Sequence, residues 1–94
     1  MGYVLKWELA PGQASLLLPP GARALSAKPQ FGGSVVLYTL SDTMDASRQV
    51  GTIAVPTGTC FLLPLDYEFV DTVDLNGLFF HVFVQNLHLD GLVW

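Results

Sequence analysis

The most regular pattern of apolar and polar positions lies between Tyr67 and Val84, where two arms rich in aromatic and β-branched residues flank Asn76-Gly77. Asn-Gly tolerates a positive φ at both central positions of a type I′ turn, and such a turn joins antiparallel strands. The second arm, residues 78–84, is apolar on both of its faces. We therefore predict a β-hairpin whose second strand is covered on both faces, by the fold or by another copy of the chain.

The rest of the chain alternates between short apolar runs and turns rich in proline and glycine. The 34–40 run is apolar on both faces and belongs at the centre of a sheet, whereas Lys28-Pro29 ends a weaker run and marks a sheet edge. No stretch has capped apolar residues at helical spacing over three turns, so no helix longer than one turn is expected. Further strands are predicted over residues 3–10, 14–18, 22–27, 34–40, 48–55 and, briefly, 60–63.

These elements predict an all-β fold, a small antiparallel β-sandwich or partly closed barrel of seven or eight short strands. Within it, Gly51 interrupts the 48–55 strand and marks either a bulge or a close approach of backbone. The 94 residues make one domain. We assign residues 1–85 to a single β domain and residues 86–94 to an apolar C-terminal tail that packs on the domain or on a neighbouring subunit.

Composition adds an expectation of self-association. Hydrophobic residues make up 51% of the chain and charged residues only 13%, which leaves little polar surface to cover the apolar content of a small domain. Part of the apolar area is therefore expected to be buried between subunits, most simply in a homodimer.

Charge and cysteine content exclude several classes of partner. The formal net charge is −4, with Lys6, Arg23, Lys28 and Arg48 as the only cations, and four scattered cations cannot bind duplex nucleic acid through its phosphates. No apolar run is long enough to span a membrane, and no targeting signal is evident. The single Cys60 excludes an internal disulfide and is expected to be a buried small hydrophobe.

A series of short motifs runs along the chain; in order they are Trp7 and Leu9, Leu18 to Ser26, Gln30, Val36 to Tyr38, Thr57-Gly58, Val70 to Val73 and the closing His81-Val82-Phe83. Together these motifs resemble a family of small uncharacterised phage and prophage all-β proteins. The resemblance covers roughly residues 5–84 and implies a phage origin and, with it, a location in the host cytoplasm. Because its motifs are turn glycines and core aromatics, it implies no catalytic residues.

The residues capable of chemistry form no set typical of an enzyme, so no catalytic residue, metal site or cofactor is predicted. His81, between Phe79 and Phe83 on one strand face, is expected to be a neutral core histidine bonded to a backbone carbonyl; contact with a ligand is the alternative. Asp71 interrupts the apolar face of its strand, and we expect it to pair with Arg23 or Arg48.

Two non-enzymatic functions remain. The favoured one is a homo-oligomeric phage binding module that sequesters a host nucleotide signal, or binds a host defence protein, in a pocket between subunits; the alternative is a virion structural or assembly accessory protein. In the first case, Arg23 and Arg48 would bind phosphate and Tyr38 would stack on a base. The full set of candidate ligand-binding residues is Arg23, Tyr38, Arg48, Thr57, Thr59 and His81, with Lys28 and Phe31 in support.

Overall fold

The protein consists of strands joined by turns and loops, as the sequence predicts. The computed structural model describes residues 2–10 and 12–85, and the predicted C-terminal tail at 86–94 lies outside these residues. The described part of the chain contains no helix. Its strands are β1 (Tyr3–Leu9), β2 (Ser15–Leu18), β3 (Arg23–Gln30), β4 (Ser34–Ser41), β5 (Arg48–Pro56), β6 (Tyr67–Leu75) and β7 (Leu78–Gln85).

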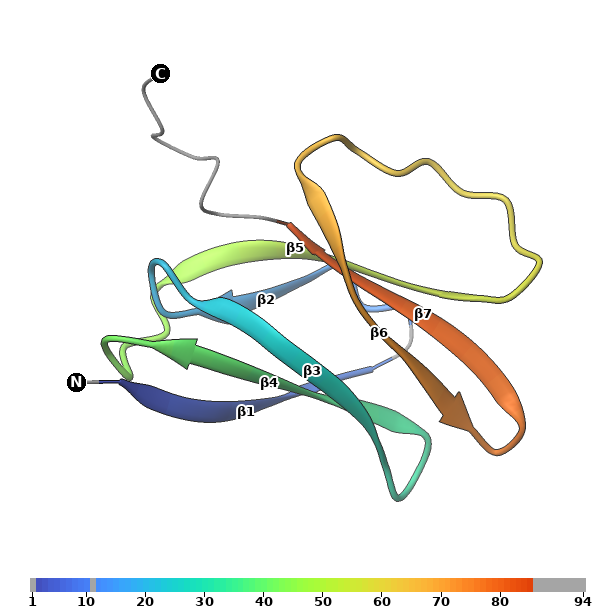
Figure 1. Ribbon diagram of the computed structural model, residues 1–94, viewed down its shortest axis with the longest axis horizontal. Helices are drawn as coiled ribbons and strands as arrows, with labels where there is room; N and C mark the ends of the chain where they lie inside the picture. The colour runs from blue at the N-terminus through green and yellow to red at the C-terminus, as the bar shows by residue number, and fades with distance from the viewer. Residues whose placement is uncertain (1, 11, 86–94) are drawn as a thin grey trace.

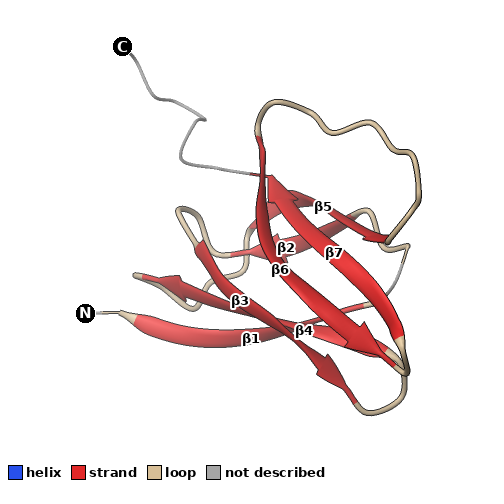
Figure 2. Ribbon diagram, turned by 45° about the vertical axis from the view of Figure 1, so that its right-hand side comes forward, coloured by secondary structure: helices blue, strands red, loops and turns tan. Residues whose placement is uncertain are grey.

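The strands form two antiparallel sheets, with strand orders β1-β4-β3 and β2-β5-β7-β6 (Figures 1 and 2). Strand β4 is central in the first sheet and β3 lies at its edge, so both of these predictions are confirmed. Strand β3 packs beside β6 without pairing to it. The architecture is therefore a sandwich and not a closed barrel.

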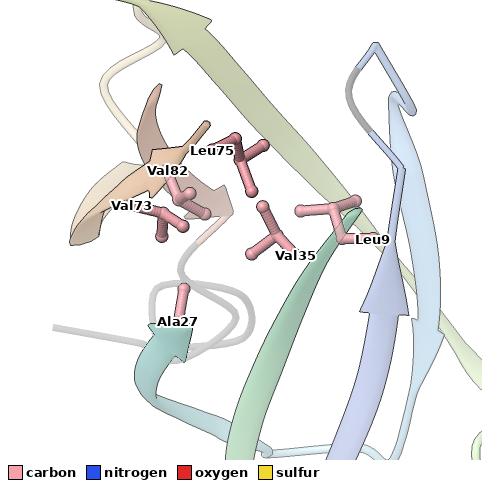
Figure 3. Packing of buried hydrophobic residues seen from close by; sticks show 6 residues of the cluster. All are labelled: Leu9, Ala27, Val35, Val73, Leu75 and Val82. Carbon is pink, nitrogen blue, oxygen red and sulfur yellow. The ribbon is translucent and has the colours of Figure 1, made fainter. Parts of the chain in front are cut away.

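The core fills the space between the two sheets. In one cluster, Leu9 and Val35 of the first sheet meet Val73, Leu75 and Val82 of the second (Figure 3). A second cluster joins buried side chains of both sheets, namely Leu18, Leu37, Val50 and Val84. Burying one such side chain stabilises the fold by about 1.5–3 kcal/mol relative to leaving it exposed. The two inner faces are therefore the main source of stability.

The β6–β7 hairpin has the predicted turn. Asn76 and Gly77 have φ angles of 56° and 87°, and Leu75 pairs with Leu78 across the turn. The Gly77 N–H donates to Oδ1 of Asp74 at 2.7 Å, which satisfies a turn donor that points away from the sheet. The two-residue hairpin at Asn76-Gly77 is thus confirmed.

Asp71 lies at the seam between the two sheets. A bulge between Phe69 and Asp71 shifts the register of β6, so that Asp71 is opposite the buried Val82. Its Oδ2 accepts the Ala27 N–H of edge strand β3 at 3.2 Å and lies 3.9 Å from Lys28 Nζ. The expected pairing with Arg23 or Arg48 is therefore wrong: the carboxylate caps an edge N–H, which also blocks that edge to other strands.

Three local predictions need correction. Residues 60–63 are not a strand but part of an irregular loop over 57–66, in which Phe61 packs on Phe83 of the second sheet instead of pairing along β5. Cys60 is exposed instead of buried. Strand β3 continues through Pro29 to Gln30, which an edge strand permits because the missing N–H of proline can face away from its neighbour.

The turn provides a test of the hairpin. Gly77→Val should lower the free energy of unfolding by about 1 kcal/mol or more, because a β-branched residue is strained at positive φ. Gly77→Asn is the matched control and should cost less, since asparagine tolerates this conformation. Urea denaturation measures both. Equal stability of the valine and asparagine variants would contradict the turn assignment.

Candidate binding faces

The structure divides the predicted ligand-binding residues between the two sheets. Arg23 begins β3 and Tyr38 lies in β4 of the first sheet, whereas His81 lies in β7 and Thr57 and Thr59 lie in the loop after β5. Arg48 begins β5, opposite Leu18. The predicted residues therefore do not form a single pocket within one chain.

Basic residues gather on the outer face of the first sheet. The side chains of Leu9, Val35 and Leu37 point into the core, so the alternate positions on β1 and β4 point outward. Tyr38 is paired with Lys6 on one side and Ser26 on the other. Arg23 is paired with Leu40 and Lys28 with Val36, on the same face. We call this surface, defined by Lys6, Arg23, Lys28 and Tyr38, the cationic face.

The cationic face concentrates positive charge in an acidic protein. Lys6, Arg23 and Lys28 are all exposed, and two acids lie near them. Glu8 is opposite Val36 in the same sheet and accepts a hydrogen bond from Gln30 at 3.2 Å, and Asp71 contacts Lys28 across the seam. The other described acids lie in the β4–β5 loop or on and beside β6; they are Asp42, Asp45, Asp66, Glu68 and Asp74. The outer face of the first sheet therefore has a net positive charge.

Large apolar side chains gather on the outer face of the second sheet and in the loop beside it. Phe83 contacts Phe69 and the loop residue Phe61, with ring centroids 5.7 and 5.4 Å away. Phe69 remains 57% exposed, and Leu62 and Leu65 are 88% and 101% exposed. We call this surface the apolar face; it comprises Phe61, Leu62, Leu63, Leu65, Phe69, Phe79 and Phe83.

His81 holds the start of the 57–66 loop against the hairpin. Its Nε2 lies 2.7 Å from Thr57 Oγ1, and its Nδ1 lies 3.0 Å from Thr72 Oγ1 on β6. The expected bond to a backbone carbonyl is therefore wrong, since the partners are two hydroxyls. Because both ring nitrogens are bonded, His81 links the loop to strand β6. Within residues 2–10 and 12–85, no group of three or more His, Cys, Asp or Glu side chains could hold a metal ion.

Three N–H groups in the turns that contain Gly58 and Gly33 donate to carbonyl groups of the chain. The Thr57 N–H donates to the Phe79 carbonyl at 3.0 Å and the Thr59 N–H to the Pro56 carbonyl at 3.2 Å. The Gly33 N–H donates to the Gln30 carbonyl at 3.2 Å, and the shallow pocket beside this turn is lined by Asp74 and by none of the cations. These three N–H groups close turns, so they are not available to an anion.

A tyrosine closes one end of the apolar face. The Tyr67 hydroxyl lies against the Cα of Gly51, in space that a Cβ would occupy. The close approach predicted at Gly51 is therefore present, although a side chain makes it and not backbone. Gln85 accepts the Gly51 N–H at 3.1 Å and donates to Asp66 at 2.8 Å. This polar cluster separates the apolar face from the strand β2 side of the sheet.

Comparison with family models, curated proteins and solved structures found no match to this chain. The described residues form no helix that could cross a membrane. The two faces must therefore be interpreted from their own chemistry.

The His81 link can be tested by removing its partners one at a time. Thr57→Val and Thr72→Val should each lower the free energy of unfolding by about 1 kcal/mol, because each leaves a ring nitrogen without its hydroxyl. Thr59→Val, at an exposed position of the same loop, is the control and should change stability by less than about 0.5 kcal/mol. Thermal or urea unfolding gives all three values. A Thr57 variant no less stable than the Thr59 variant would contradict the link.

Proposed function

We propose that the protein is a non-enzymatic binding module that assembles into a homo-oligomer, most simply a dimer, through its apolar face. The observation that supports this most is the exposure of phenylalanine and leucine side chains over one sheet and its adjoining loop. Their combined exposed area is on the order of several hundred Å², which is large for one patch on a monomer. It approaches the roughly 800 Å² that each partner contributes to an interface of standard size.

The composition of the apolar face also suits an interface. Its members are all phenylalanine or leucine, and interface cores are enriched in aromatic residues and depleted of charge. Phe83 already contacts both Phe61 and Phe69, so the face has an ordered aromatic centre before any partner binds. Asp74, opposite Phe79, is at its rim, where a charged group can stay in water.

Association through this face has a consequence for ligand binding. The apolar face and the cationic face belong to opposite outer surfaces of the sandwich, since the core lies between their sheets. A dimer joined through the apolar faces would leave both cationic faces directed outward. The pocket between subunits that would combine Arg23 and Tyr38 with Thr57 and His81 is therefore not part of this proposal.

A virion structural or assembly accessory protein remains the second candidate, because the same apolar face could cover a different phage protein. The two candidates differ in the behaviour of the isolated chain. The binding module associates with itself, whereas the accessory protein stays a monomer until its partner is present. Both suit the small phage proteins that the sequence resembles.

The test is the mass of the protein in solution over a range of concentrations. The wild-type chain should sediment as an oligomer at tens of micromolar. The double variant Leu62→Ser/Leu65→Ser should associate at least about tenfold more weakly, because each buried leucine contributes about 1.5–3 kcal/mol. Both side chains are almost fully exposed in the single chain, so the fold of the variant should be unchanged.

Val4→Ser is the control for this experiment. Val4 is 65% exposed but lies on β1 of the other sheet, so its loss should leave the association unchanged. A wild-type protein that is monomeric at these concentrations would remove the self-association proposal and favour the assembly accessory protein. An oligomer that weakens equally with Val4→Ser would place the contact on another surface.

A further inference from the structure

Three of the four cations of the chain surround one aromatic side chain on the cationic face. Along β4, Leu40 and Val36 are four residues apart, so their partners Arg23 and Lys28 are separated by about 13 Å. Lys6 and Arg23 lie on opposite sides of β4 and are also offset by two residues along it, so they are about 12 Å apart. Tyr38, which is half-buried, lies between them.

A bulge produces this arrangement. Strict alternation along β3 would place Arg23 and Lys28 on opposite faces, because five positions separate them. The register of β3 shifts between Ala24 and Ser26, so the extra residue Leu25 brings both cations to the outer face. Bulges re-aim side chains in this way and are common at sheet edges.

The charges on this face are available to a partner. The contact between Lys28 and Asp71 is 3.9 Å long and the lysine side chain is 62% exposed, so the pair is weak and easily exchanged. Glu8 is the one acid on the face within the described residues, and it already accepts a hydrogen bond from Gln30. Lys6 is opposite Tyr38 and Arg23 is opposite Leu40. Both cations therefore lie farther along β4 than Glu8 and Lys28, which are both opposite Val36.

We infer that the cationic face binds a short single-stranded oligonucleotide, with phosphates on Lys6, Arg23 and Lys28 and a base on Tyr38. Cations about 12–13 Å apart suit a ligand that carries more than one phosphate, and an aromatic ring on an open sheet face suits stacking with an unpaired base. Three cations are too few for a duplex, which requires many phosphate contacts. The surface is open along the sheet, so a strand can cross it without entering a pocket.

This inference does not depend on the proposed function, because it concerns the opposite surface of the sandwich. Loss of self-association would leave the cationic face intact, and loss of oligonucleotide binding would leave the apolar face intact. The inference also assigns a role to Lys6, which the sequence pattern alone places on a solvated strand face. It leaves Arg48, Thr57, Thr59 and His81 outside the site.

The experiment is fluorescence anisotropy of a labelled single-stranded oligothymidylate titrated with the full chain, repeated at several salt concentrations. We expect saturable binding that weakens with salt, with a slope of log affinity against log salt near −2, since each phosphate contact to a single strand contributes about −0.7. Lys6→Gln and Arg23→Gln should each weaken binding about fivefold and each reduce the slope by about 0.7. Tyr38→Leu should weaken binding about fivefold or more without changing the slope.

Arg48→Gln is the matched control, because it removes the same charge from the chain but lies on the other sheet. It should leave both the affinity and the slope unchanged. Thermal unfolding of each variant checks that the fold is retained; Lys6 and Arg23 are both exposed, so little change is expected.

Separate titrations with inorganic phosphate, ATP and a cyclic dinucleotide distinguish the sources of the phosphate. If the cyclic dinucleotide displaces the labelled oligonucleotide from the wild-type chain but binds neither the Lys6→Gln nor the Arg23→Gln variant, the result would support the same site, with a free nucleotide as its ligand. Absence of oligonucleotide binding, or equal competition by inorganic phosphate, would overturn the inference. Equal effects of Arg48→Gln and Arg23→Gln would also overturn it, since binding would then follow net charge and not the cationic face.

Discussion

The structure depends on the packing of the inner faces of the two sheets against each other. Val35 of the first sheet and Val82 of the second are almost completely buried in this layer, and the same layer contains every large buried side chain of the two core clusters. Because strand side chains alternate, filling the inner layer leaves an equal set of positions directed outward. The outer faces contribute little to the core, so their composition is informative about binding.

Two bulges decide which residues reach the outer faces. In β6, the shift between Phe69 and Asp71 keeps Phe69 outward beside Phe83 and turns Asp71 inward, where it caps the Ala27 N–H. In β3, the shift between Ala24 and Ser26 places Arg23 and Lys28 on one face. The β3 bulge thus joins two cations that simple alternation would separate, and the β6 bulge separates Phe69 from Asp71, which alternation would place on one face. The β6 bulge places Phe69 beside the aromatic side chains of the apolar face, and the β3 bulge places two cations on the cationic face. The core lies between these two faces.

The sequence was sufficient for the fold class and for the parts of it that depend on local chemistry. Asn76-Gly77 identified its hairpin because few dipeptides tolerate two positive φ angles, and Pro29 marked an edge because proline cannot donate to a neighbouring strand. The binding faces were harder to predict from the sequence. Arg23, Lys28 and Tyr38 were recognised as candidates, but that they share one face with Lys6 follows only from strand register and a bulge, which no single segment specifies. The strand predicted at 60–63 was wrong for a similar reason: the run is apolar enough for a strand, but Phe61 packs on Phe83 of a distant strand, and no single segment specifies that contact.

The central claim is that the two outer faces have different roles, with the apolar face buried on association and the cationic face left open. Hydrogen–deuterium exchange of the protein at low and high concentration tests this most directly. At high concentration, exchange should slow in the 57–66 loop and in the Phe69 and Phe79–Phe83 segments, with β1, β3 and β4 unchanged. Slower exchange confined to β1, β3 and β4, or no change with concentration, would contradict the claim.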